Sequence, residues 1–244
     1  MSILNLFKST KKEEEKLWDK VFYERKKIWK KTFGLFPSEI HKLGNLSGIW
    51  PGGLLIQMFS RKLGGLWVTS SFGLTNPDMP TNRKSEYHKI NNSKEGTVSY
   101  LQTISARIPK EIDRALAGYG YEIAILTKEV GMWPFMFINT IVQMEILNDI
   151  GFLERVQEIG AVTIDRVKIS ETDYGNFIIF EAPSNLIKEF NLRNGKAKLL
   201  LAMPITDNEM NYTLVNGQKE LLNLLTLIDS FPVGDLNRES ILFE

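Results

Sequence analysis

Few side chains in this sequence could perform catalysis. His41 and His88 are its two histidines, and cysteine is absent. Because histidine is the usual general base near neutral pH, a hydrolase built on this chain would have to combine one of them with a neighbouring carboxylate. The lack of cysteine removes thiolate nucleophiles, disulfides and zinc–thiolate sites together.

Sequence motifs for catalysis, metal binding and nucleotide binding are missing as well. Neither histidine has a second ligand at the spacing of a His-Glu-x-x-His motif, and no Gly-x-Ser-x-Gly segment marks a nucleophilic serine. No Gly-x-x-x-x-Gly-Lys-Ser/Thr loop for phosphate occurs. We therefore predict no catalytic residues, no metal site and no cofactor, and we interpret His41 as a cap or surface residue. An enzyme with an unmarked, hydrolase-like active site is the alternative.

Two other features have structural and functional interpretations. Gly118-Tyr119-Gly120 looks like the start of a dinucleotide fingerprint, but these glycines precede a predicted strand, so we interpret them as turn residues. Glu122 is the one carboxylate inside an apolar strand segment. It either meets solvent on an exposed strand face or must find a hydrogen-bond partner.

Composition and charge indicate a globular protein without a global electrostatic field. Hydrophobic residues make up 43% of the 244, and 30 basic against 29 acidic residues leave a formal net charge of +1. This balance argues against a general nucleic-acid binder. The apolar window Met132 to Leu147 is too short to span a membrane, and the N-terminus lacks the core of a signal peptide. We expect a cytoplasmic protein.

The first half of the chain predicts a helix followed by strands. Apolar residues recur at helical spacing from Lys11 to Lys31, with Lys and Glu between them. This helix either packs on a domain, which we favour, or lies on an anionic membrane. Strands are predicted at Leu54 to Phe59 and Gly65 to Ser71. The polar region from Leu74 to Gly118 offers one strand or helix start, at Tyr100 to Ile108.

The second half mixes helices and strands without a regular alternation. A strand at Tyr121 to Thr127 leads into a helix from Met132 to Gly151, and Asp235 with Arg238 forms a candidate clamp on the terminal segment. We predict an α+β single domain with a mixed β-sheet flanked by helices, residues 33–244, preceded by an amphipathic N-terminal helix, residues 1–32, that packs on it. The remaining predicted elements are strands at Val162 to Ser170, Phe177 to Pro183 and Ala197 to Met203, and a helix from Thr206 to Leu227 that opens with a Thr206/Glu209 capping box.

Several segments, in their order, resemble the suppressor of fused family. Trp67 to Leu74, WVTSSFGL, resembles the W-x-x-x-S-x-G-L strand and turn of the family, and Gly118 to Ile123, GYGYEI, resembles its G-x-G-x-E-L strand. Further matches are Trp133-Pro134 at a helix start, Asp165 to Val167, LLLAMPITDNEM at Leu199 to Met210, and Gly234-Asp235-Leu236-x-Arg238. Together they cover roughly Phe33 to Phe243.

The resemblance implies a protein-binding domain similar to the amino-terminal lobe of the animal protein, and no catalysis. The animal protein grips an extended segment of Gli transcription factors between two lobes. Glu122 matches one peptide-contacting position of the family, whereas Thr69 stands where the animal protein has Tyr, and the NPDMP loop could present Asp78. We therefore expect Thr69, Asp78 and Glu122 at a site for another protein.

Lobe-only members are a bacterial type associated with immunity, so a cognate toxin is the leading partner. A regulatory protein that binds an extended peptide by strand addition is the alternative.

Overall fold

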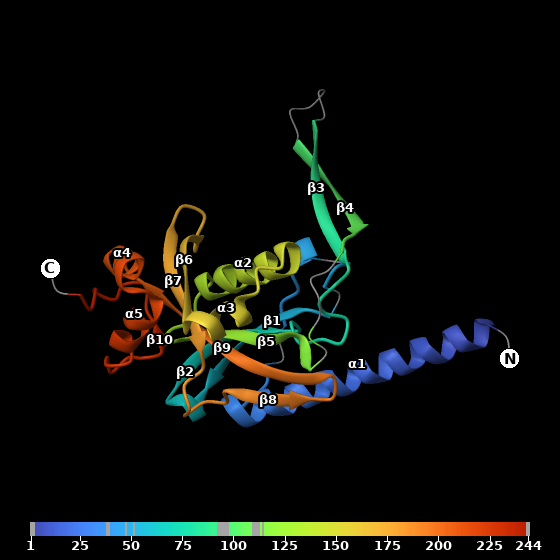
Figure 1. The fold of residues 1–244 in the computed structure, drawn as a ribbon, viewed down its shortest axis with the longest axis horizontal. Coiled ribbons are helices and arrows are strands. Elements are labelled where there is room, and N and C mark those ends of the chain that lie inside the picture. The colour runs from blue at the N-terminus through green and yellow to red at the C-terminus, as the bar shows by residue number, and fades with distance from the viewer. Residues whose placement is uncertain are drawn as a thin grey trace.

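The chain folds around one large mixed sheet with helices on both faces (Figure 1). The computed structural model describes residues 3–37, 40–46, 48–50, 52–91, 98–108, 113 and 115–242. Of these, residues 3–12, 45, 90–91 and 98–100 are described by their backbone alone. The helices are α1 (Ile3–Phe33), α2 (Trp133–Asn148), α3 (Phe152–Ile159), α4 (Asp207–Asn216) and α5 (Gln218–Leu225), with short 3-10 turns η1 (Gly44–Leu46) and η2 (Arg61–Leu63). The strands are β1 (Leu54–Ser60), β2 (Leu66–Phe72), β3 (Arg83–Asn91), β4 (Val98–Ala106), β5 (Leu116–Thr127), β6 (Ala161–Lys168), β7 (Tyr174–Glu181), β8 (Glu189–Leu192), β9 (Gly195–Ile205) and β10 (Val233–Gly234).

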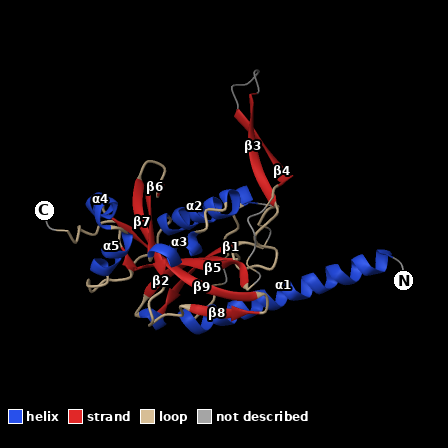
Figure 2. Cartoon of the chain, viewed as in Figure 1, coloured by secondary structure: helices blue, strands red, loops and turns tan. Residues whose placement is uncertain are grey.

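The sheet has the order β1-β2-β5-β9-β7-β6, with β8 added to β9 and β10 added to β5. The central pair β5 and β9 is parallel, and the other pairs along that path are antiparallel. Both central strands are buried on each face along most of their length, which is the pattern of strands covered on two sides. Helices α2 and α3 cover one face and α1 crosses the other (Figures 1 and 2).

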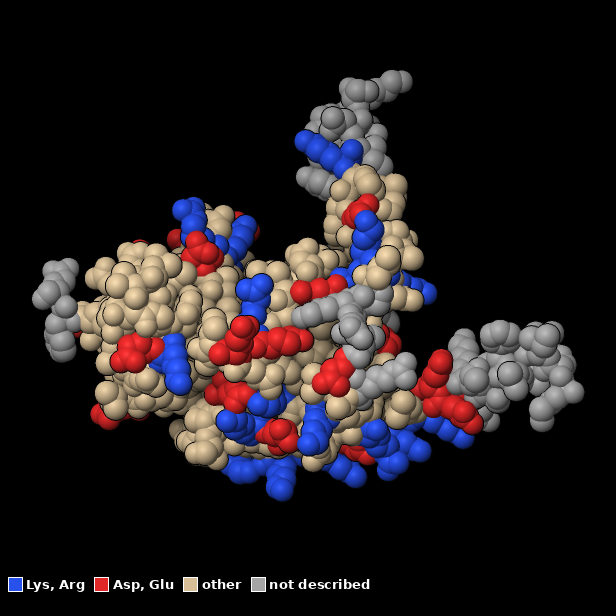
Figure 3. Space-filling model, in the orientation of Figure 1, with Lys and Arg blue, Asp and Glu red and all other residues tan. Residues whose placement is uncertain are grey.

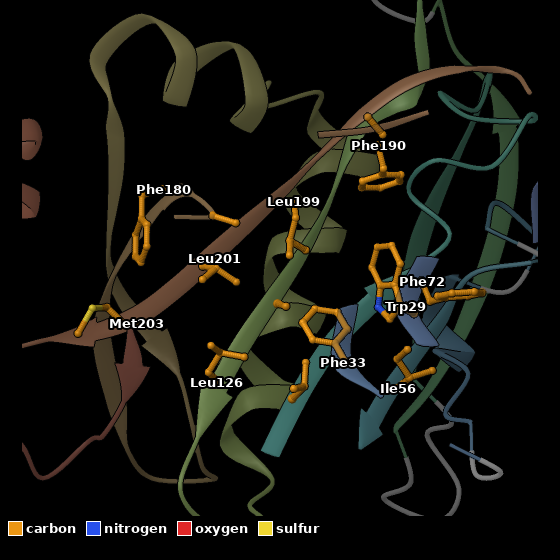
Figure 4. Packing of buried hydrophobic residues seen from close by; sticks show 14 of the residues in the cluster. Trp29, Phe33, Ile56, Phe72, Leu126, Phe180, Phe190, Leu199, Leu201 and Met203 are labelled. Atoms are coloured by element: carbon orange, nitrogen blue, oxygen red, sulfur yellow. The ribbon is translucent and has the colours of Figure 1, made fainter. Parts of the chain in front are cut away.

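The alternation of side chains along β5 and β9 divides the core into two layers. Ile123 and Ile125 join the cluster under α2 and α3, whereas Ala124 and Leu126 join the cluster under α1. Figure 4 shows the cluster under α1, where Trp29 and Phe33 of that helix lie among residues of the sheet. The Trp29 ring meets Phe33, Phe72 and Phe190 edge-on and donates its N–H to Ser70 Oγ at 3.3 Å.

The predicted α+β fold is confirmed, as is the capping box. Thr206 Oγ1 accepts from the Glu209 N–H, and the Glu209 carboxylate accepts from the Thr206 N–H. The predicted single helix from Thr206 to Leu227 is wrong, because Gly217 breaks it into α4 and α5. Its φ of 84° and ψ of 157° lie outside the helical region.

The sequence prediction also missed elements. In the polar region, Tyr100 to Ile108 was the one candidate, and the structure forms β4 there. That strand pairs with the unpredicted β3 in a two-stranded arm that projects from the body (Figure 1). Helix α3 and strand β8 were not predicted, and β5 begins at Leu116, so Gly118 to Gly120 lie inside a strand and not in a turn before one.

Candidate functional site

Glu122 lies fully buried in β5, with its carboxylate surrounded by donors. Oε1 accepts from the backbone N–H groups of Gly73 at 2.8 Å and Thr75 at 3.1 Å, and from Thr75 Oγ1 at 2.7 Å. Oε2 accepts from Ser71 Oγ at 2.7 Å. The strand face that carries Glu122 is therefore not exposed, and the second sequence-based alternative, a hydrogen-bonded carboxylate, is what the structure shows.

Arg25 of α1 supplies the positive charge that faces this carboxylate. Its side chain is fully buried, and Nη1 donates to Glu122 Oε1 at 3.3 Å and to Thr75 Oγ1 at 2.7 Å. Nη2 donates to Asn76 Oδ1 at 2.8 Å, and the guanidinium lies 4.1 Å from the centroid of the Phe72 ring. Burial lowers the pKa of Arg25, and the negative charges of Glu122 and Asp78 act in the opposite direction.

These contacts hold residues 73–80, which we call the 73–80 loop, at the end of β2. Two further side chains bond the loop backbone. Trp50 Nε1 donates to the Gly73 carbonyl at 2.9 Å, and Asn194 Nδ2 donates to the Thr75 carbonyl at 3.0 Å. Leu74 and Met79 are buried, whereas Asp78 is exposed. The network thus fixes the backbone of a loop whose charged residue faces solvent.

Gly118 permits the close approach of this loop to β5. The Tyr119 N–H donates to the Leu74 carbonyl at 3.0 Å. Gly118 has a φ of 58°, and a Cβ at this position would lie 2.2 Å from the Leu74 oxygen. The glycine is needed for its backbone conformation and for the missing side chain together. This is the structural role of the Gly118-Tyr119-Gly120 motif, and no nucleotide fingerprint is needed to explain it.

The three residues predicted to contact a partner occupy different environments. Thr69 is fully buried in β2, where its Oγ1 accepts from Gln57 Nε2 at 2.8 Å. Glu122 is buried beneath the 73–80 loop, and Asp78 lies on that loop at the surface. The structure therefore joins Asp78 and Glu122 through one loop and leaves Thr69 outside the network. Their role in binding stays a prediction.

Sequence reasoning missed Arg25, Thr75 and Asn76 as members of this network. One signal was available for Arg25, which lies between Val21 and Trp29 at helical spacing on the apolar face of α1. A charged residue on a buried helix face needs a buried partner. Thr75 and Asn76 gave no such signal, because polar residues are ordinary in a loop.

The histidines do not meet in one site. His41 pairs through its backbone with Leu55, and its ring lies 4.8 Å from the ring of Phe135. His88 lies on the β3–β4 arm, where Nε2 is 2.9 Å from Thr103 Oγ1. Among the described residues, no group of three or more His, Asp or Glu side chains could hold a metal ion.

The C-terminal clamp has a different acidic partner from the one we predicted. Arg238 forms two bonds with Glu209, Nη1 to Oε1 at 2.7 Å and Nη2 to Oε2 at 2.5 Å, while Asp235 Oδ1 accepts from the Asn237 N–H at 2.9 Å. The Ile241 N–H also donates to Glu209, at 2.9 Å. The Glu209 carboxylate thus ties the terminal segment to the start of α4.

Comparison with known proteins places the chain in a family. The Suppressor of fused protein family matches residues 53–239. The chain belongs to this family, as the sequence resemblance predicted. A comparison with curated protein sequences gave no match.

Three solved structures are similar to this chain to different degrees. A suppressor of fused homologue from Neisseria gonorrhoeae superimposes with a TM-score of 0.55 at 15% identity, covering 94% of this chain and 99% of that one. The structure of a Sufu–Fu complex gives 0.48 at 12% identity over 91% of each chain. Drosophila Suppressor of Fused gives 0.41 at 13% identity, over 77% of this chain and 42% of that chain. The first of these likenesses supports the same fold and nothing further.

None of the helices in the described part of the chain combines the length and the apolar character that crossing a membrane requires.

Proposed function

We propose that this chain is a non-catalytic protein-binding domain that presents the 73–80 loop to a partner protein in the cytoplasm. The observation that supports the proposal is the burial of Glu122, whose carboxylate is occupied by four donors from the chain besides Arg25. A carboxylate held in this way is not free to act as a general base. Its contacts instead fix the loop that exposes Asp78, and a fixed loop loses less entropy on binding.

The specific partner that we propose is a cognate bacterial toxin, which the chain binds and blocks as an immunity protein. Family membership supports protein binding in general, since one structural relative is described in a complex of Sufu with Fu. In this proposal Asp78 contacts the partner directly, whereas Thr69 and Glu122 act from beneath the surface by holding β2 and the loop.

A tagged pull-down from lysate of the source cell, read by mass spectrometry, tests the binding function. Glu122→Lys is unsuitable as a probe, because a buried lysine beside Arg25 would disrupt the fold. Asp78→Lys reverses an exposed charge, and Asp165→Lys makes the same change on the exposed part of the edge strand β6. We expect one stoichiometric partner that is lost with Asp78→Lys and retained with Asp165→Lys.

The immunity role needs a second measurement. The captured partner, expressed alone in a host cell, should arrest growth, and coexpression of the wild-type chain should restore it. Asp78→Lys should fail to restore growth although the variant remains folded by circular dichroism. If the partner does not arrest growth, the immunity role is wrong but the protein-binding function stands. If Asp78→Lys still captures the partner, the 73–80 loop is not part of the interface.

A further inference from the structure

A second candidate surface lies at the other end of β2, beside the edge strand β1. A groove of about 810 Å³ opens there between the end of α1 and the β1–β2 hairpin. Its lining includes the apolar side chains of Phe36, Met58 and Trp67. Phe59 and Leu35, which also line it, are 43% and 76% exposed. Large apolar side chains gathered in one concave surface are typical of a binding site.

The rim of this groove is positively charged. Arg61 and Lys62 of η2 line it and are exposed, and Lys62 Nζ donates to the Lys31 carbonyl at the end of α1. Lys26 Nζ lies 5.0 Å from the centroid of the Phe36 ring. None of the described residues that line the groove is acidic. In a chain with a net charge of +1, this is a local concentration of positive charge.

The last turns of α1, which end at the groove, are also basic, whereas the exposed acidic residues Glu13, Glu14, Glu15 and Asp19 lie nearer the start of the helix. Lys27, Lys30 and Lys31 are exposed there, and the apolar face of residues 13–33 is buried against the sheet. Figure 3 shows Lys and Arg side chains gathered along the lower edge of the molecule, where Figure 1 places α1 and β8. Lys30 and Lys31 lie in the last turn of α1, whose final residue Phe33 lines the groove, so they add positive charge near the rim.

We propose that this groove binds a short segment of a partner protein that inserts an apolar side chain and carries Asp or Glu on either side of it. The apolar lining suits a hydrophobic anchor, and the rim cations suit carboxylates. A lipid surface fits less well, because α1 buries its apolar face against the sheet over residues 13–33, where its side chains are described, and because the groove is concave. A nucleic acid fits less well, because the lining offers aliphatic and aromatic side chains where phosphates would need donors.

This inference rests on the proposed protein-binding function but concerns a different surface. β2 runs from Leu66 to Phe72, with Trp67 at the groove and Gly73 at the start of the 73–80 loop. Seven strand residues span roughly 20 Å. Variants at one end of β2 can therefore be tested without altering the other.

The test selects peptides from a random 12-residue library displayed on phage, against the full chain. Enriched peptides are then synthesised, and their affinity is measured by fluorescence anisotropy. The groove variants are Arg61→Glu combined with Lys62→Glu, and separately Phe59→Ser. The matched control is Lys168→Glu combined with Lys219→Glu, which makes the same charge change at exposed positions of β6 and α5, and β6 lies at the opposite edge of the sheet from β1. Asp78→Lys is measured in parallel.

We expect enriched peptides with an apolar residue flanked by Asp or Glu. Each groove variant should weaken their binding by about tenfold or more, with no change for the control or for Asp78→Lys. No enrichment, peptides without this pattern, or equal binding by the groove variants would overturn the proposal. Vesicles containing phosphatidylserine, or single-stranded DNA, that displace the peptides and depend on Arg61 and Lys62 would also overturn it, in favour of a lipid or nucleic-acid ligand.

The outcomes separate the two proposals. If the groove variants lose peptide binding but still capture the pull-down partner, that partner binds outside the groove. The groove is then a second binding site. If the groove binds no such peptides but Asp78→Lys loses the pull-down partner, the proposed function stands and only this inference is refuted.

Discussion

Arg25 and Glu122, 97 residues apart in the sequence, meet at 3.3 Å with both side chains fully buried. The pair joins α1 to the centre of the sheet and, through Thr75, to the 73–80 loop. Because the two charges lie away from water, each depends on the other and on the surrounding hydrogen bonds. The N-terminal helix is thus part of the site and not an attachment to it.

Removal of one member of this pair should destabilise the protein strongly. Glu122→Ala leaves the Arg25 charge buried without its partner, and we expect a loss of about 3–5 kcal/mol in the free energy of unfolding. Urea unfolding followed by circular dichroism measures it. Glu24→Ala is the matched control, because Glu24 pairs with Arg193 at a solvent-exposed position and should cost at most about 1 kcal/mol. Equal losses for the two variants would contradict the structural role of the buried pair.

Replacement of both charges should cost less than the two single changes together. The double variant Arg25→Met with Glu122→Gln removes both buried charges, so neither is left unpaired. A double-mutant cycle with Arg25→Met and Glu122→Gln measures the coupling free energy, which we expect to be of the order of 1–3 kcal/mol. Strict additivity would show that the two side chains act independently.

The steric role of Gly118 can be separated from its backbone conformation. Gly118→Ala places a Cβ against the Leu74 carbonyl, whereas Gly64→Ala meets open space at a similar positive φ of 70°. We expect about 1–2 kcal/mol of destabilisation for Gly64→Ala, from the left-handed backbone alone. Gly118→Ala should cost about 1–3 kcal/mol more because the loop must shift. Thermal unfolding of both variants decides, and equal losses would refute the close approach.

Helix α1 should contribute through its buried face. Trp29 is fully buried among three aromatic rings, so Trp29→Ala should lower the free energy of unfolding by about 3–5 kcal/mol. Tyr23 lies on the same helix and is 60% exposed, so Tyr23→Ala should change stability by less than about 0.5 kcal/mol. If Trp29→Ala unfolds with the same midpoint as the wild type, α1 does not stabilise the sheet.

The Glu209–Arg238 contact should make the C-terminal segment sensitive to acid. Burial alone would raise the pKa of Glu209, but the bonds from Arg238 and from the Ile241 and Thr206 N–H groups outweigh it and lower this pKa below the ordinary value of 4.5. The folded state then binds the proton less readily than the unfolded state. Its stabilisation is complete above pH 4.5 and is lost as the pH falls through the folded-state pKa.

Hydrogen exchange of residues 233–242 as a function of pH measures this effect. We expect protection near neutral pH that declines below about pH 4.5 in the wild type. Glu209→Gln should show weaker protection at neutral pH and little further change on acidification. A wild-type segment whose exchange shows the same pH dependence as that of Glu209→Gln would contradict the role of the carboxylate.

Local patterns were sufficient for the elements whose signals lie within a few residues. The helical spacing of Leu17, Val21 and Trp29 predicted α1, and Thr206 with Glu209 predicted the start of α4. These signals survive in the structure because the periodicity of a helix and a capping box depend on near neighbours. The order of the motifs also identified the family.

The arm and the buried network depend on distant parts of the chain. β3, with the sequence RKSEYHKIN, is polar and lacks apolar alternation, so only its pairing with β4 makes it a strand. The same limit applies to Glu122. Its sequence neighbours allowed either solvent or a hydrogen-bond partner, and the choice was made by Arg25 on α1 and by the 73–80 loop.

By itself, the sequence determined the fold class, the amphipathic N-terminal helix and the scarcity of catalytic groups. The tertiary structure alone decided that Glu122 is buried beneath the loop, that Asp78 is exposed on it, that Arg238 pairs with Glu209, and that an apolar groove with a basic rim lies beside β1. The physical reason is that burial and charge pairing are set by contacts between residues far apart in sequence, and these arise only when the sheet brings its strands and helices together.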